Sequence, residues 1–127
     1  MITSTVMSVV LAPSPAVPAT ITFLPVEKSL LASIDAKDFA RELLTRKNYK
    51  CFSRLVGKES AWRNAHNPTS SAKGIGQLLD GTYRNLGMKH SQVKAAQVVA
   101  SLAYIGRKYG SSGPCGAWKH WQKNNWY

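Results

Sequence analysis

Residues 59–82 read ESAWRNAHNPTSSAKGIGQLLDGT, and they interrupt a chain whose flanks carry helical patterns of apolar residues. From residue 63 to residue 76 this stretch is dominated by Asn, Pro, Ser, Thr and Gly, a composition typical of loops and tight turns. Glu59 stands at the end of the preceding helical pattern, immediately before the loop. We therefore expect a structured but irregular segment between helices, with one acidic side chain at its entrance.

Two helices are predicted on the N-terminal side of this stretch. The first begins near residue 33 with Asp35 as its cap, and a break at residues 48–49 separates it from the second, which runs to Glu59. Their apolar residues recur at the spacing of one helix face. These residues are Phe39, Leu43 and Leu44 in the first helix and Phe52, Leu55 and Val56 in the second.

Three further helices are predicted on the C-terminal side, over about residues 78–86, 91–109 and 116–123. Gly87 is a favourable C-cap for the first of them. No stretch of residues 35–127 shows the alternation of a β-strand, so the expected fold class is mainly α, in a single domain over these residues.

Residues 1–34 form a separate segment, either a Pro-rich N-terminal arm or a weak signal-like sequence. Its first 26 residues carry no charged side chain, and its prolines exclude a long helix. The apolar run at residues 6–11 is too short to span a bilayer, and no Lys or Arg precedes it as a secretory signal requires. An arm is therefore favoured over a signal peptide, and no membrane span is expected.

The chain is strongly basic. Its 127 residues contain 17 Lys and Arg against 6 Asp and Glu, a formal net charge of +11. Nucleic acid, an anionic membrane and an anionic cell-wall polymer all fit this charge as partners. After residue 50 the only acids are Glu59 and Asp80, which excludes carboxylate-rich calcium or magnesium sites from that half.

Glu59 is the candidate for acid–base chemistry. The helix dipole disfavours a carboxylate at a helix C-terminus, and Leu55, Val56 and Trp62 are close enough in sequence to desolvate it. Both effects raise a carboxyl pKa, as a general acid near neutral pH requires. Composition alone favours the alternative, an ordinary surface acid, and Asp80 is expected to cap a helix. An enzyme of this composition that cleaves sugars would therefore work with one carboxylate.

Cys51 and Cys115 are the only cysteines, and neither they nor His66, His90 and His120 have the spacing of metal ligands, so no metal site is expected. From spacing alone, a disulfide and two buried free thiols are equally good interpretations. Aromatic side chains could line a groove and stack on sugars or bases. They are Trp62, Trp118, Trp121, Trp126, Tyr83, Tyr104, Tyr109 and Tyr127.

The motifs, taken in order, resemble those of the soluble lytic transglycosylase family over about residues 49–127. The tail resembles a subgroup of such domains in secreted actinobacterial proteins and in phages. The matching parts are Glu59-Ser60, the polar loop with Asn67-Pro68, Gly74-Ile75-Gly76-Gln77, Thr82, the stretch LAYIGRKYG at residues 102–110, and PCGAW at residues 114–118.

The resemblance implies a lysozyme-like fold, of the goose-type lysozyme and transglycosylase kind. It implies cleavage of the β-1,4 bond between N-acetylmuramic acid and N-acetylglucosamine in peptidoglycan. Glu59 would protonate the glycosidic oxygen and then act as base on the muramic acid C6 hydroxyl, which closes a 1,6-anhydro ring without a cofactor. Because the subgroup has a matching cysteine pair, the resemblance also favours a Cys51–Cys115 disulfide. A secreted, periplasmic or virion-associated protein acting at the bacterial cell wall is then expected.

Further substrate-binding residues follow from position in the family motifs. Gln77 should hydrogen-bond substrate near the cleaved bond, and Tyr104 should line the cleft and could orient Glu59. Asn67 falls near a family serine that contacts the N-acetyl group, and Ser60 adjoins the catalytic position. Two residues depart from the pattern. Trp118 replaces a tyrosine that approaches the catalytic acid, and Gly76 replaces a frequent Met, which removes a side chain from the cleft floor.

The leading hypothesis is a monomeric lytic transglycosylase that binds peptidoglycan glycan strands, has no nucleic-acid partner and does not span a membrane. A hydrolytic muramidase on the same fold is one alternative, and it would need a positioned water, with Asp80 as the only acid that could help. A non-catalytic wall-binding or virion structural module is another, and the intact Glu59 and Gln77 argue against it. A nucleic-acid binder is disfavoured because no recognised nucleic-acid-binding motif is present.

Overall fold

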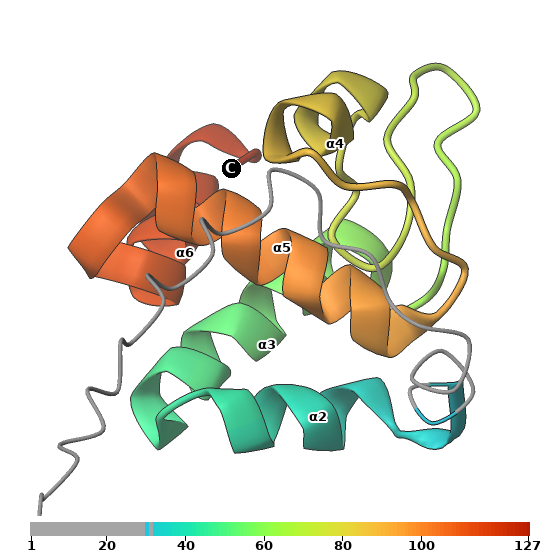
Figure 1. Ribbon diagram of the computed structural model, residues 1–127. Coiled ribbons are helices and arrows are strands. Elements are labelled where there is room, and N and C mark those ends of the chain that lie inside the picture. The colour runs from blue at the N-terminus through green and yellow to red at the C-terminus, as the bar shows by residue number, and fades with distance from the viewer. Residues whose placement is uncertain (1–29, 31) are drawn as a thin grey trace, which may run out of the picture.

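The computed structural model describes residue 30 and residues 32–127 (Figure 1). The predicted arm falls mostly on residues 1–29 and 31, which lie outside the described residues. The described chain is mainly helical, as predicted, and contains isolated β-bridges in the loop but no β-strand. Its elements are α2 (Ala36–Leu43), α3 (Arg46–Ser60), α4 (Asp80–Leu86), α5 (Lys94–Tyr109), a 3₁₀ turn (Gly110–Ser112) and α6 (Gly113–Asn124).

Side-chain caps decide where the first two of these helices start. The Asp35 carboxylate accepts a hydrogen bond from the Asp38 amide at 3.0 Å, which confirms the predicted cap of α2. The predicted break at residues 48–49 is wrong. The chain breaks earlier, at Thr45, whose hydroxyl accepts a hydrogen bond from the Asn48 amide at 3.2 Å. This cap satisfies an amide that has no partner within the helix, so α3 begins before the expected position.

The later helices differ from expectation only at their ends. Gly87 ends α4 in the left-handed conformation, with φ of 66°, as predicted. α5 starts at Lys94, after a turn in which the Ser91 hydroxyl accepts a hydrogen bond from the Val93 amide at 3.1 Å. α6 starts before residue 116 because Pro114 fits a first helical turn, where a missing amide hydrogen costs no helical hydrogen bond.

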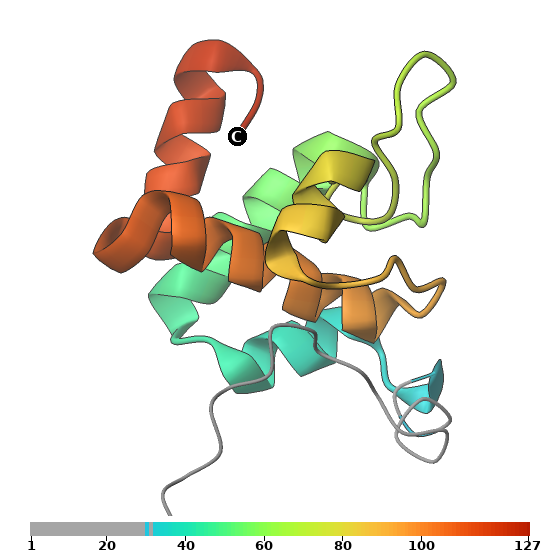
Figure 2. The same cartoon turned by 45° about the horizontal axis from the view of Figure 1, so that its top comes forward.

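The helices enclose one main core. α3 packs against α2 and α6, while α5 packs against α2, α4 and α6 (Figures 1 and 2). A disulfide between Cys51 of α3 and Cys115 of α6 joins two of these helices, with Cα atoms 4.9 Å apart, and confirms the expected pairing. The core contains Phe52, Leu55, Val56, Ile75, Val98, Ile105 and Ala117, all at most 1% exposed.

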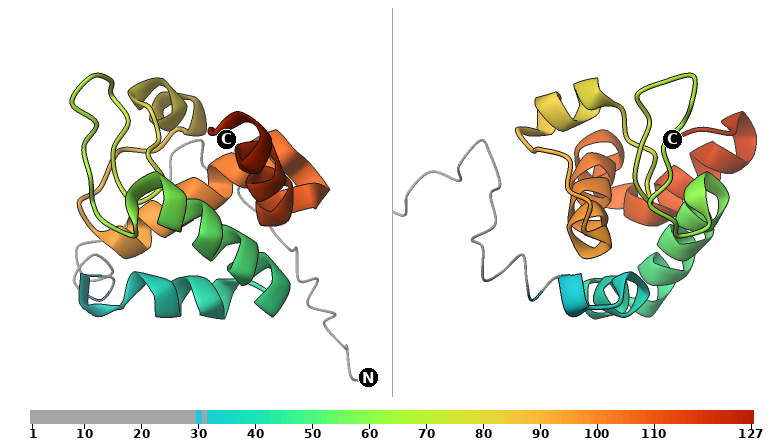
Figure 3. Two further views of the ribbon diagram at one scale, coloured as in Figure 1. Left: turned by 180° about the vertical axis from the view of Figure 1, so that it is seen from behind. Right: turned by 90° about the vertical axis from the view of Figure 1, so that its right-hand side faces the viewer.

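A second apolar cluster attaches α4 to α5. Leu78, Tyr83 and Met88 are buried against Ala100 of α5, and Tyr127 packs against the same cluster. Beyond α6 the chain turns back toward α4, so its last residue lies near that helix (Figure 3). No helix in the described part of the chain has both the length and the apolarity to cross a membrane.

Candidate active site

Glu59 is held at the end of α3 by a tight left-handed turn. Ala61 and Trp62 have φ angles of 53° and 61°, so the chain reverses directly after the helix. Trp62 is buried and packs edge-on against Phe52, with ring centroids 5.8 Å apart. Because this turn is anchored in the core, the position of Glu59 is set by the packing of the whole domain.

Glu59 lines a cavity of about 240 Å³. Gln77 and Tyr104, two of the predicted binding residues, line the same cavity, as does Thr82 of the sequence motif. Its remaining walls are Leu78, Leu79, Trp126 and Tyr127. Of the acids among the described residues, Glu59 alone lines it.

The surroundings of Glu59 raise its pKa above the ordinary value of a glutamate. Burial is the larger cause, because it disfavours the charged carboxylate. A hydrogen bond of 2.9 Å from the Trp121 indole N–H to Glu59 Oε1 acts in the opposite direction. The net effect keeps the carboxyl protonated to a higher pH, which is the property of a general acid.

The indole donor is Trp121, whereas the motif position predicts Trp118. Trp118 stacks on Trp121 with ring centroids 5.7 Å apart and an angle of 11° between the rings, and it is not among the residues that line the cavity. The two side chains share one side of α6, as their spacing predicts. Since α6 packs along α3, Trp121, one turn after Trp118, is the residue whose indole reaches Glu59.

Gln77 enters the cavity from a residue with φ of 51°, in the left-handed region. Its Nε2 donates to the carbonyl oxygens of Ala65 at 3.0 Å and of Gly74 at 2.8 Å, so both amide hydrogens are used within the loop. These bonds fix the orientation of the side chain. The atom left to bind a substrate hydroxyl or amide is Gln77 Oε1.

Tyr104 and Tyr127 form a connected wall. The Tyr104 hydroxyl donates to a main-chain oxygen of Tyr127 at 3.0 Å, and the Tyr127 hydroxyl donates to the Gly76 carbonyl oxygen at 2.6 Å. Burial, and to a lesser extent the charge of Glu59, raises the pKa of Tyr127 well above its ordinary value, so its hydroxyl remains a donor. Tyr104 lines the cleft, but its hydroxyl bonds to Tyr127 and Lys108 and not to Glu59.

The position of Gly76 in the motif suggests an open cleft floor, but the structure shows this floor to be filled. A Cβ atom at this position would lie 2.1 Å from Ser101 Oγ and 2.8 Å from the Tyr127 hydroxyl. The volume that a side chain would take at residue 76 is therefore already occupied by Tyr127 and Ser101. Glycine is required here because two other side chains meet over its backbone.

Ser60 and Asn67 do not have the predicted contact with the cavity. Ser60 is only 6% exposed, and its hydroxyl donates to the Ile75 carbonyl oxygen at 2.5 Å, so it ties α3 to the loop. Asn67 Oδ1 accepts hydrogen bonds from the amide and the hydroxyl of Thr69, both at 2.9 Å, and Asn67 does not line the cavity. Both polar side chains satisfy the backbone of the loop, a role that is common for Ser and Asn in turns.

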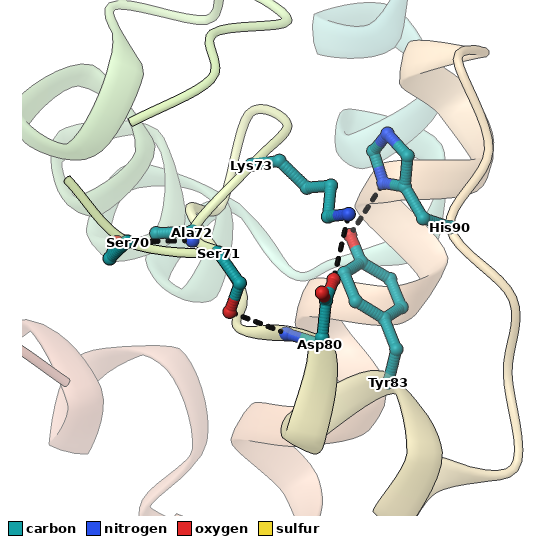
Figure 4. Close-up of polar contacts among 7 residues, drawn as sticks. All are labelled: Ser70, Ser71, Ala72, Lys73, Asp80, Tyr83 and His90. Carbon is teal, nitrogen blue, oxygen red and sulfur yellow. Dashed lines mark hydrogen bonds and ion pairs between the residues drawn. The ribbon is translucent and has the colours of Figure 1, made fainter. Parts of the chain in front are cut away.

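Asp80 lies outside the cavity, and its predicted role as a cap is wrong, because its side chain makes no capping hydrogen bond to α4. Its carboxylate pairs with Lys73 Nζ at 2.7 Å, which lowers the pKa of Asp80, and its amide donates to the Ser71 hydroxyl at 3.1 Å (Figure 4). Beside this pair, the Tyr83 hydroxyl and His90 Nδ1 are 3.2 Å apart. These contacts attach the loop to α4 and give Asp80 a structural role.

Trp121, Trp126 and Tyr127 are residues of this site to which the motifs assign no individual role. All three belong to the aromatic set expected to line a groove, and they lie in the tail that resembles the secreted and phage subgroup. Trp126 lines the cavity although it is 54% exposed, so part of its ring is accessible to a ligand.

Among residue 30 and residues 32–127, no group of three or more His, Cys, Asp or Glu side chains could hold a metal ion. Comparison of the chain with protein-family models, with curated proteins and with solved structures found no match. The interpretation of the site therefore rests on its geometry and on the sequence motifs.

Proposed function

We propose that the chain is a lytic transglycosylase of lysozyme-like fold that cleaves peptidoglycan, with Glu59 as its general acid and base. The observation that carries this proposal is that, among the described residues, Glu59 is the single acidic side chain of the cavity, with its pKa raised by burial and its carboxylate held by the Trp121 indole. Hydrolytic glycosidases ordinarily use two carboxyl groups. A reaction in which the substrate supplies its own nucleophile needs only one.

The proposed reaction conserves every atom of the glycan. Protonated Glu59 donates its proton to the glycosidic oxygen as the bond to C1 of N-acetylmuramic acid breaks, and the N-acetylglucosamine side leaves as an alcohol. The neighbouring N-acetyl group can stabilise the cation that develops at C1. The Glu59 carboxylate then takes the proton of the C6 hydroxyl, whose oxygen attacks C1 of the same sugar. The product is a 1,6-anhydro ring, and Glu59 is protonated again.

The other cavity residues suit a polar carbohydrate. Gln77 Oε1 offers an acceptor in the cavity that Glu59 lines, and Trp126, which packs against Lys108 and His120, offers the exposed part of its ring to a sugar. The net charge of +11 favours attachment to an anionic wall. The Cys51–Cys115 disulfide supports an oxidising location, so we place the protein outside the cytoplasm as a secreted, periplasmic or virion-associated enzyme.

The substitution Glu59→Gln tests the assignment, because it keeps the shape of the side chain and removes the transferable proton. We expect loss of sacculus lysis by at least a factor of about 100, the typical contribution of a general acid, with an unchanged circular dichroism spectrum. Glu42→Gln is the matched control, since Glu42 is exposed on α2 and does not line the cavity. Equal lysis by the Glu59→Gln variant and the parent protein would refute the catalytic assignment.

Mass spectrometry of the digested sacculi identifies the reaction class. Muropeptides that end in 1,6-anhydro-N-acetylmuramic acid are the expected products. Reducing ends would instead identify a hydrolytic muramidase. If the folded parent protein cleaves no glycan, the wall-binding or virion structural module becomes the better interpretation.

A further inference from the structure

The cavity of Glu59 continues into a second hollow. A neighbouring cavity of about 170 Å³ shares Thr82 and Tyr104 with the first and is otherwise lined by Asn85, Leu86, Arg107 and Lys108. The shared residues come from α4 and α5, so the two cavities adjoin along the junction between these helices. Glu59 lines only the first cavity, and Arg107 and Lys108 line only the second.

The two cations are held in place by neutral partners. Lys108 Nζ donates to the Tyr104 hydroxyl at 2.9 Å and lies 4.4 Å from the centre of the Trp126 ring. Arg107 donates to the Asn85 carbonyl oxygen at the end of α4. In the described part of the chain, ion pairs are formed by Arg41 and Lys73 and by neither of these cations. Within the described residues, neither cation is therefore paired with an acidic side chain, although the Tyr104 hydroxyl links Lys108 to a main-chain oxygen of Tyr127.

We propose that Arg107 and Lys108 form a subsite that binds a carboxylate carried by the glycan strand. This inference rests on the proposed function. Tyr104 lines both cavities and holds the Lys108 ammonium at its hydroxyl, so the Lys108 charge lies where the two cavities adjoin, and Arg107 lies further along the second. A sugar bound beyond Tyr104 would present its acidic substituent to the two cations. Arg107 can engage a carboxylate in two parallel hydrogen bonds, and Lys108 adds a point charge.

Peptidoglycan offers this carboxylate from two sources. The lactyl group of N-acetylmuramic acid carries one when no peptide is attached. When a peptide stem is attached, the lactyl carboxyl becomes an amide and the stem supplies the acid groups. Three soluble tetrasaccharides of alternating N-acetylglucosamine and N-acetylmuramic acid distinguish these sources: one with free lactyl acids, one with peptide stems, and one with methylamidated lactyl groups.

Titration calorimetry with the Glu59→Gln protein gives the affinity for each probe without turnover. We expect Arg107→Gln and Lys108→Gln each to weaken binding of a carboxylate-bearing probe by about tenfold to a hundredfold, as for the loss of one hydrogen bond to a charged group. Both variants should bind the methylamidated probe as the Glu59→Gln protein does. Lys94→Gln is the matched control, since it removes the same exposed charge at the other end of α5.

If the two variants lose affinity only for the probe with free lactyl acids, the subsite binds the lactyl carboxylate. If they lose affinity only for the probe with peptide stems, the subsite binds the stem. If the Glu59→Gln protein binds the probes but the variants bind them equally well, the subsite is refuted and the proposed function stands. If no probe binds and the parent protein does not cleave sacculi, both proposals fail. Thermal melts show whether each variant is folded. Arg107 also bonds to α4 through the Asn85 carbonyl oxygen, so if Arg107→Gln lowers the melting temperature, the Lys108→Gln variant alone decides the test.

Discussion

Gly76→Ala should destabilise the protein through a clash in the floor of the cleft. The added Cβ would lie 2.1 Å from Ser101 Oγ and 2.8 Å from the Tyr127 hydroxyl, well inside van der Waals contact. One extra methyl group in a packed interior costs about 1–3 kcal/mol. The smaller entropy of the unfolded Ala chain returns about 0.4–1 kcal/mol. The difference between these two ranges is a net loss centred on about 1.3 kcal/mol and at most about 2.6 kcal/mol. Each kcal/mol lost lowers the Tm of a domain of this size by about 4–8 °C.

Urea denaturation and thermal melts of three further variants identify the cause. Gly106→Ala is the control, because no atom lies within 4 Å of a Cβ on Gly106, and replacing this helical glycine should stabilise the protein by about 1 kcal/mol. Within the described residues the buried Ser101 hydroxyl makes no well-formed hydrogen bond, and the neighbouring Tyr127 hydroxyl already donates to the Gly76 carbonyl oxygen, so Ser101→Ala should cost little. Combined with Gly76→Ala, it removes the shortest contact and should recover much of the lost stability.

The reasoning is refuted if Gly76→Ala is as stable as the parent protein to within about 0.5 kcal/mol, the usual effect of a surface substitution. It is also refuted if Ser101→Ala adds to the loss and does not relieve it. Since Tyr127 lines the Glu59 cavity, a shift of its ring should also reduce lysis by protein that remains folded.

Three further predictions follow from the site. Trp121→Phe removes the N–H that lowers the Glu59 pKa, so the alkaline limb of the pH–rate profile should move to higher pH. An unchanged alkaline limb would show that this limb does not report the ionisation of Glu59. Because folding raises this pKa, stability should also fall as pH rises from the unfolded pKa through the folded one. Asp80→Asn should leave lysis and anhydro products unchanged, and lost activity would indicate a second catalytic carboxylate. Thiol titration before reduction should find no free Cys51 or Cys115, and reduction should cost about 4 kcal/mol in the chain-entropy model.

The helices are predictable because their signals are local. Asp35 and Gly87 act within one turn of their own positions, and both were predicted as caps. The error at residues 48–49 has a local cause too. Asn48 and Tyr49 suggest a helix break by their residue types. The Thr45 hydroxyl caps the helix before them, so both residues lie within α3.

Polar residues of the loop were harder to assign than apolar ones. Ser60, Asn67 and Asp80 have side chains that suit a binding site, and in each case the structure uses them to hold the loop. A buried backbone needs hydrogen-bond partners as much as a ligand does. The sequence cannot distinguish these two uses, because the same atoms serve both.

The amino-acid sequence by itself determined the helical class, the irregular segment after Glu59 and the scarcity of acids, which leaves only Glu59 and Asp80 after residue 50. The tertiary structure decided which residues surround that carboxylate. Trp121 rather than Trp118 reaches Glu59, and Tyr127 fills the space above Gly76. Each of these contacts joins residues more than 50 positions apart in the chain. They depend on how α6 docks on α3 and on the path of the chain beyond it, which no local pattern of spacing or composition encodes.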